Sequence, residues 1–230
     1  CGTARRTTGH LFPSPPDESM NNPYLLLFRE ALKQPDAHDD WDLQWSLAHR
    51  FSWAVPTERT IREIRDFSPL GIVEIGAGTG YWASLLKESG ADVIAYDSNP
   101  VELGSNRYHR NEKTSEPVKS FTTVLAGGAR AVVRHPERAL MLCWPPHDWN
   151  ANTPYAVRSM SNRALAHFKG DRLIYIGQPE GGLTGSRKFH QMLRASWVLI
   201  RKVRTPNFRG KRTSVYLFQR RSQQEGLIQT

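Results

Sequence analysis

The chain has 230 residues, of which 39% are hydrophobic and 23% charged, an ordinary composition for one globular domain with short appendages. Its formal net charge of +9 favours an anionic partner such as nucleic acid, an acidic peptide or an anionic cofactor. No apolar run is long enough to span a bilayer, and the first residues lack the apolar segment of a signal peptide, so neither a membrane nor export is expected. Only Cys1 and Cys143 are present, which argues against a disulfide framework and favours a cytoplasmic location.

The N-terminal part is expected to form an arm followed by helices. Residues 1–22 are rich in Pro, Ser, Thr and Asn, which predicts a flexible arm without regular structure. Residues 23–68 carry apolar side chains at helical spacing, which predicts two or three helices that cap the main domain. Thr57 is the expected N-cap of the last of these helices.

Residues 69–222 are predicted to form a Rossmann-like α/β domain with a mostly parallel sheet and helices on both faces, because apolar runs alternate with amphipathic stretches. A C-terminal antiparallel hairpin completes seven expected strands, and residues 223–230 are read as a tail. The strands are expected near residues 71–75, 93–96, 121–125, 139–143, 172–176, 198–203 and 214–219. Helices are expected at residues 81–88, 101–108, 154–168 and 186–194.

The first predicted strand ends in a glycine turn that leads directly into a helix. Gly76, Gly78 and Gly80 let the backbone bend tightly and approach a ligand, and the following helix presents free N–H groups. Asp97 ends the next strand, 23 residues after Glu74, where a carboxylate can accept both hydroxyls of a ribose. The pattern therefore predicts a nucleotide-like ligand, with a ligand-free tight turn as the alternative.

Residues 74–80 resemble motif I of the class I S-adenosylmethionine-dependent methyltransferases, which reads E-x-G-x-G-x-G, and Asp97 matches that family's acidic residue after the second strand. The resemblance implies S-adenosylmethionine as cofactor, with the glycines beside its methionine part and Asp97 on its ribose. Gly128 lies where the family contacts the adenine, although a plain turn accounts for it equally well. The implied cofactor-binding residues are Glu74, Gly76, Ala77, Gly78, Gly80, Trp82, Asp97, Ser98, Gly128, Cys143 and Trp144.

A nicotinamide-dependent dehydrogenase is the competing interpretation of this turn. Its fingerprint also has spaced glycines and an acidic residue about 20 positions later. The G-x-G-x-x-G spacing is not met, because Trp82 and Ala83 stand where a further small residue would lie. The methyltransferase interpretation is therefore preferred.

A second candidate site follows the fourth predicted strand, in the order Trp144, Pro145, Pro146, His147, Asp148 and Trp149. Two prolines end the strand stiffly at the carboxyl edge of the sheet. The position resembles the family's motif IV, often D/N-P-P-Y/F, but Trp144 replaces the Asp or Asn and His147 replaces the aromatic residue. This departure argues against methylation of exocyclic amines on nucleic-acid bases.

The acceptor is expected to lie among aromatic side chains at this edge. Trp144, Pro145, Trp149 and Trp53 are the candidate acceptor-binding residues, with Glu180 pointing inward from the glycine-rich loop after the fifth strand. His147 or Asp148 is the candidate to take a proton from the acceptor, the alternative being that His147 only caps a turn. The histidines and cysteines show no metal-ligand spacing, so no metal is expected.

The sequence thus predicts an S-adenosylmethionine-dependent methyltransferase that acts on oxygen or nitrogen of a small-molecule or peptide acceptor. The alternative is an RNA methyltransferase or a noncatalytic RNA-binding protein, because no Asp or Glu occurs between residues 181 and 224 while basic residues are frequent between residues 187 and 221. The sequence gives no indication of the oligomeric state.

Overall fold

The computed structural model describes residues 20–34, 40–104, 106, 108–109, 118–147, 159–208 and 210–222. Its strands are β1 (Ile72–Ile75), β2 (Val93–Asp97), β3 (Val124–Ala126), β4 (Ala139–Cys143), β5 (Arg172–Gly177), β6 (Trp197–Arg204) and β7 (Ser214–Arg220). Its helices are α1 (Pro23–Ala31), α2 (Trp41–Arg50), α3 (Glu58–Phe67), α4 (Tyr81–Glu88), α6 (Met160–His167) and α7 (Arg187–Ser196), with short 3-10 helices η1 (Val101–Leu103) and η2 (Ala129–Arg134).

The strands form one seven-stranded sheet in the order β3-β2-β1-β4-β5-β7-β6 within the part of the chain that the structure describes. β1 to β5 pair in parallel, whereas β7 lies antiparallel between β5 and β6. This is the strand order of the class I methyltransferase fold, so the predicted fold is confirmed. A dinucleotide-binding sheet has the order 3-2-1-4-5-6 instead, without an inserted antiparallel strand.

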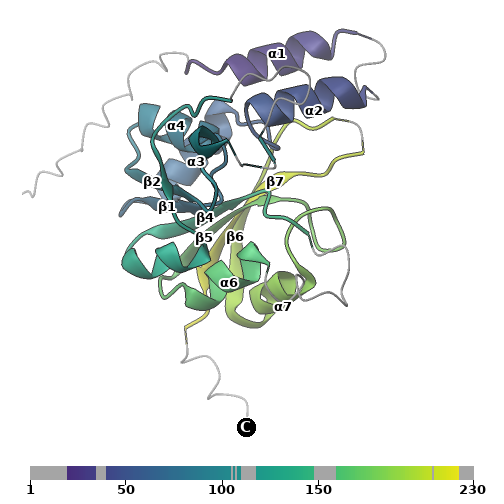
Figure 1. Ribbon diagram of the computed structural model, residues 1–230. Coiled ribbons are helices and arrows are strands. Elements are labelled where there is room, and N and C mark those ends of the chain that lie inside the picture. Colours follow the sequence, from purple (N-terminus) through teal and green to yellow (C-terminus); the bar gives the residue numbers. More distant parts are fainter. Residues whose placement is uncertain are drawn as a thin grey trace, which may run out of the picture.

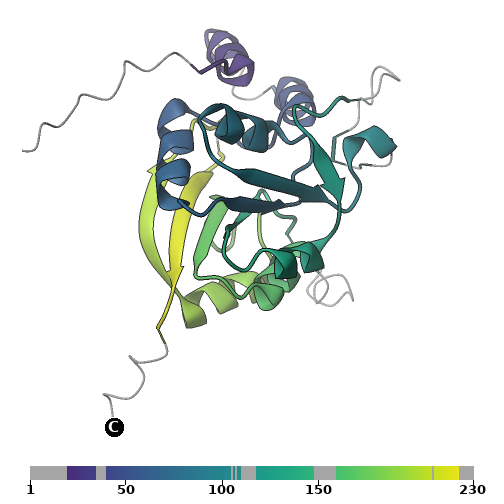
Figure 2. The same ribbon diagram turned by 90° about the vertical axis from the view of Figure 1, so that its left-hand side faces the viewer.

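Helices cover both faces of this sheet, as predicted. Successive residues of β1 point to opposite faces and belong to two different hydrophobic clusters. Ile72 belongs to the cluster that also contains buried residues of α1, α2, α3 and α4, whereas Val73 belongs to the cluster shared with η2, α6 and α7. Figure 1 shows α6 and α7 on one side of the sheet, with α1 and α2 lying above α3 and α4. Figure 2 shows the same layers from the side.

The predicted helical cap corresponds to three helices, and its last one is capped as expected. The Thr57 hydroxyl accepts a hydrogen bond from the Thr60 backbone N–H at 3.2 Å, while the Thr60 hydroxyl accepts one from the Thr57 N–H. Residues of α1, α2 and α3 share one hydrophobic cluster with the strands. The cap is therefore continuous with the core of the sheet domain.

Two predicted elements differ from the observed ones. The helix expected over residues 101–108 is confined to η1, because Gly104 adopts a left-handed φ of +68° directly after Leu103. The third strand begins at Val124, three residues later than expected. The expectations for residues 1–19, for the start of the helix at 154–168, for Asp148 and Trp149, and for residues 223–230 lie outside the described residues.

The carboxyl ends of β1, β2, β4 and β5 meet at one edge of the sheet, since these strands are parallel neighbours. The glycine turn, Asp97 and Trp144 consequently lie at the same edge. Among the described helices, none is long and apolar enough to cross a membrane.

Candidate functional site

A cavity of about 640 Å³ lies at this edge, which is within the range of roughly 300–1,000 Å³ typical of ligand sites. Part of its wall comes from the segments after β1 and β2, namely Gly76, Gly78, Asp97, Ser98 and Asn99. Another part comes from the segment after β4, namely Cys143, Trp144, Pro146 and His147. The structure thus brings the two sequence motifs together in one cavity.

The glycine turn presents bare backbone to the cavity. Gly76, Gly78 and Gly80 have φ angles of +77°, +57° and +70°, a region that residues with a Cβ rarely adopt. The N–H groups of Gly76 and Ala77 donate to the Tyr96 carbonyl at 2.8 and 3.0 Å, which fixes the turn against β2. A Cβ added at Gly78 would clash with the ring of His109. Glycine is therefore required here both by conformation and by space.

Asp97 is tied to the glycine turn by its carboxylate. Its Oδ2 accepts from the Gly78 N–H at 2.9 Å, and its Oδ1 accepts from the Asn99 N–H at 2.8 Å. Burial raises the pKa of Asp97, while these two hydrogen bonds act in the opposite direction. Because a carboxylate has about four acceptor sites, two remain for hydroxyl donors from the cavity.

Glu74 lies in β1 and is buried, with only 1% of its surface exposed. Burial, followed by the nearby charge of Asp97, raises the pKa of Glu74 to about 8. Its Oε2 has no hydrogen-bond partner among the described residues. Glu74 is therefore mainly protonated at pH 7. It does not line the cavity, whereas Asp97 does.

Trp144 is held in a strained backbone conformation at the end of β4. Its φ is +47°, and among the described residues no other non-glycine residue has a positive φ. Its N–H donates to the Ile176 carbonyl at 2.7 Å, and its indole Nε1 donates to the Thr213 hydroxyl at 3.2 Å. Its ring stacks on Trp53, with the ring centroids 5.5 Å apart. Contacts with β5, with the segment before β7 and with Trp53 thus fix the orientation of the Trp144 ring.

Several cavity residues were not predicted from the sequence. Met160 begins α6, and a Cβ at Gly76 would touch its methyl group. Nδ1 of His109 donates to the carbonyl of His49 at 3.1 Å, because a carbonyl oxygen can only accept. Burial lowers the pKa of His109 to about 4, so its ring is neutral. No local pattern marks His109, because only the tertiary fold brings it over the glycine turn.

The structure corrects two predicted site residues. Trp82 does not reach the cavity, because its side chain is 1% exposed in the core and its Nε1 donates to the Ala54 carbonyl at 3.1 Å. Glu180 does not point inward, because it forms an ion pair with Arg194 of α7 and its side chain is 48% exposed. The polar groups of both side chains therefore have partners outside the cavity.

The remaining predicted residues divide into two groups. Trp53, Ser98, Cys143, Trp144 and His147 line the cavity together with Gly76, Gly78 and Asp97. Five predicted residues, Glu74, Ala77, Gly80, Gly128 and Pro145, are not among the cavity-lining residues, and the roles of both groups stay predictions. The described residues contain no cluster of three or more His, Cys, Asp or Glu side chains that could hold a metal ion.

No protein-family model matches the sequence. No curated protein is significantly similar to it.

Solved structures that resemble the chain include several methyltransferases. The 1,6-didemethyltoxoflavin-N1-methyltransferase of Burkholderia thailandensis is 14% identical, with 94% of this chain and 93% of that chain covered and a TM-score of 0.45. Magnesium protoporphyrin IX methyltransferase of Synechocystis is 11% identical, with 88% and 93% covered and a TM-score of 0.43. An rRNA methylase of Streptococcus thermophilus is 14% identical, with 73% and 99% covered and a TM-score of 0.41.

These identities and TM-scores are low, so the assignment of the fold rests on the sheet itself. The order of the seven described strands, the antiparallel β7 and the glycine turn hydrogen-bonded to Asp97 together carry it. The chain has the fold of the class I S-adenosylmethionine-dependent methyltransferase superfamily.

Proposed function

We propose that this protein is an S-adenosylmethionine-dependent methyltransferase that methylates oxygen or nitrogen of a small-molecule or peptide acceptor. The hydrogen bond from the Gly78 N–H to the Asp97 carboxylate is the observation that carries this proposal. It joins the two halves of the cofactor motif at the wall of one cavity. Spare acceptor sites on Asp97 and a bare glycine backbone beside it suit a nucleoside with an attached amino acid.

Each part of the cofactor site has a distinct task. Asp97 accepts hydrogen bonds from the ribose hydroxyls, while Gly76 and Gly78 allow the methionine part to approach the backbone. Ser98 and Asn99 extend the wall next to Asp97. Glu74 lies behind the turn as a neutral buried acid, and its role is to shape the site rather than to bind a charge.

Methyl transfer requires little chemistry from the protein. S-adenosylmethionine, when bound, supplies a methyl group that its sulfonium already activates. Trp53 and Trp144 orient the acceptor and exclude water, which contributes through alignment and desolvation. The imidazole of His147 lines the same cavity and can take the proton of an acceptor hydroxyl or amine, and Asp148 is the second candidate for that task.

Calorimetric titration of the full chain with S-adenosylmethionine and S-adenosylhomocysteine tests this function. We expect micromolar binding of both, and a loss of about 100-fold or more in the Asp97→Ala variant, because each hydrogen bond to a charged group contributes about 1.5–3 kcal/mol. The matched control is Asp92→Ala. Asp92 directly precedes β2, at the end of the strand opposite to Asp97, and forms an ion pair with Arg138. This control should bind both compounds like the unchanged protein.

A titration with NAD separates the dehydrogenase alternative. Preference for NAD over S-adenosylhomocysteine, or equal effects of the Asp97→Ala and Asp92→Ala substitutions, would overturn the proposed function. The antiparallel strand β7 between β5 and β6 supports the methyltransferase over the dehydrogenase.

A further inference from the structure

One wall of the cavity is built from four tryptophans, namely Trp41 and Trp45 of α2, Trp53 and Trp144, which we call the tryptophan wall. A smaller adjoining cavity of about 40 Å³ is lined by the same four residues and by Lys211, but not by the glycine turn or Asp97. The tryptophan wall with Lys211 therefore lies away from the cofactor motif and within the same open space.

The rings of this wall have fixed relative orientations. Trp53 stacks on Trp144 with an angle of 22° between the ring planes, and the ring of Trp45 meets Trp53 at 85° with the centroids 5.0 Å apart. The hydrogen bond from Trp144 to Thr213 holds the stack from the β6–β7 segment. Rigid aromatic faces in such an arrangement suit a planar ring, which gains offset or edge-to-face contacts.

Two of these tryptophans expose about half of their surface. Trp41 and Trp45 lie one helical turn apart on α2 and are 60% and 46% exposed. Two large aromatic side chains on the same cavity wall leave apolar surface that gains free energy when a ligand covers it. The exposure thus points to a binding surface rather than to core packing.

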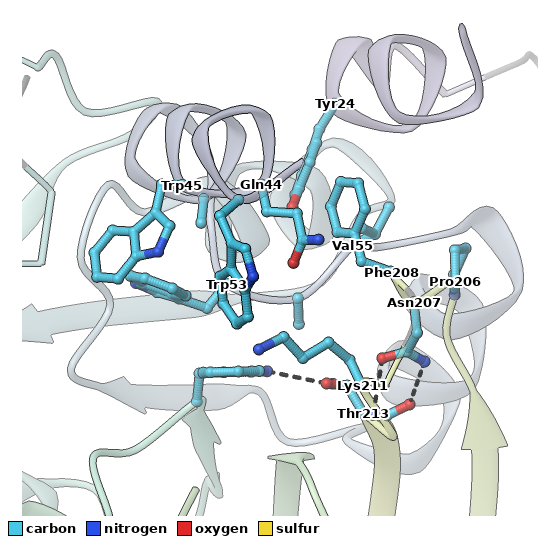
Figure 3. Close-up of a pocket in the computed structure, with 14 residues that line it drawn as sticks. Tyr24, Gln44, Trp45, Trp53, Val55, Pro206, Asn207, Phe208, Lys211 and Thr213 are labelled. Atoms are coloured by element: carbon cyan, nitrogen blue, oxygen red, sulfur yellow. Dashed lines mark hydrogen bonds between the residues drawn. The ribbon is translucent and has the colours of Figure 1, made fainter. Parts of the chain in front are cut away.

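Lys211 adds a positive charge to this apolar wall. Its Nζ lies 4.5 Å from the centroid of the Trp41 ring, and Figure 3 shows its side chain extending toward Trp53. No carboxylate among the described residues forms an ion pair with it. Partial burial lowers the pKa of Lys211. An anionic ligand group is attracted by this ammonium, whereas a cationic group is repelled.

We infer that the tryptophan wall and Lys211 form the acceptor subsite and that it binds a planar aromatic molecule bearing an anionic group such as a carboxylate. The tryptophans contact the ring system, and Lys211 pairs with the anion. The identification of this ligand as the methyl acceptor rests on the proposed function, whereas its binding does not.

Three compounds with one ring system and different charges test the inference, namely naphthalene carboxylate, naphthalene carboxamide and naphthyl trimethylammonium. Calorimetric titration of the full chain, with and without S-adenosylhomocysteine, gives their affinities. We expect the carboxylate to bind about tenfold tighter than the amide, with the cation weakest. Tightest binding of the cation would overturn the assignment, because it would show an aromatic cage that selects positive charge.

Substitutions at Lys211 give a second, independent readout. Lys211→Met should abolish the preference for the carboxylate over the amide, whereas Lys211→Arg should keep it. The matched control is Lys202→Met, because Lys202 also lies over an aromatic ring, that of Tyr216 at 5.3 Å, but does not line the cavity. Thermal unfolding followed by circular dichroism confirms that each variant is folded.

The two proposals fail in different ways. A preference for the carboxylate that survives Lys211→Met would overturn the subsite while leaving cofactor binding intact. Carboxylate binding that depends on Lys211, in a protein that does not bind S-adenosylhomocysteine, would support the subsite and overturn the proposed function.

Discussion

Glu74 and Asp97 carry the same functional group, but their surroundings differ. Asp97 accepts two backbone hydrogen bonds and faces the cavity. Glu74 is buried in β1, and its Oε2 lacks a partner among the described residues. Because burial, followed by the charge of Asp97, raises the pKa of Glu74 to about 8, the Glu74 carboxyl is mainly protonated at neutral pH.

The raised pKa of Glu74 predicts a pH-dependent stability. The pKa of about 8 in the folded protein lies above the ordinary glutamate pKa of 4.5, so the unfolded chain releases this proton first as the pH rises. The contribution of Glu74 is therefore fully present below about pH 4.5 and is lost as the pH rises through about 8. Between about pH 5.5 and 8.5 the unchanged protein should lose on the order of 3 kcal/mol of unfolding free energy relative to Glu74→Gln.

Urea unfolding of both proteins across that pH range measures this difference. Other titrating groups are common to both chains, so their contributions cancel. A difference that stays constant with pH would show that Glu74 is already ionised in the folded protein.

At the scale of elements, the turn between β1 and α4 depends on glycine for two separate reasons. Gly78 has a φ of +57°, and a Cβ there would also clash with His109. Gly90, which follows α4, has a φ of +90° but has nothing within 4 Å of an added Cβ. Substitutions at these two positions therefore distinguish the effect of backbone strain from the effect of a new Cβ that clashes beside the cavity.

Gly78→Ala and Gly90→Ala should both lower the unfolding free energy by about 1–2 kcal/mol, since each places a Cβ in a left-handed conformation. Only Gly78→Ala should also weaken binding of S-adenosylhomocysteine, by about tenfold or more, because the new Cβ and the displaced His109 enter the cavity. Chemical unfolding and calorimetric titration measure the two effects. Unchanged affinity in Gly78→Ala would contradict a cofactor at this turn.

At the scale of the whole molecule, several basic residues of segment 187–221 make contacts with other parts of the chain. Arg194 pairs with Glu180, and Arg201 pairs with Glu63 of α3 at 2.6 Å. The guanidinium of Arg220 lies 4.4 Å from the ring centroid of Trp197, and Lys211 lines the cavity. These contacts engage part of the basic segment, while the chain as a whole keeps its net charge of +9.

This distribution predicts weak and nonspecific binding of RNA. Affinity for a single-stranded RNA should fall steeply, by about 100-fold or more, between about 50 and 200 mM salt, because phosphate contacts release counterions. Affinity for S-adenosylhomocysteine should stay nearly constant, because hydrogen bonds in a partly buried site are little screened. Filter binding and calorimetry measure both, and submicromolar RNA binding that persists at the higher salt would favour an RNA acceptor.

Local chemistry determined much of this protein. The alternation of apolar runs predicted the fold. The glycine spacing and the acidic residue after the second strand predicted that Gly78 and Asp97 lie together at one sheet edge. A threonine before an amphipathic stretch predicted the N-cap at Thr57. These features depend on residue types and spacings within short stretches of the chain, which can be read directly from the sequence.

Only the tertiary structure decided which side chains face the cavity. Trp82 and Trp53 are the same residue type and were both predicted to reach the site, yet packing buries the first in the core and leaves the second on the cavity wall. His109, Lys211 and Met160 reach the site from distant segments. Side-chain direction depends on contacts between elements that are far apart in the sequence, and for that reason no local pattern could identify these residues.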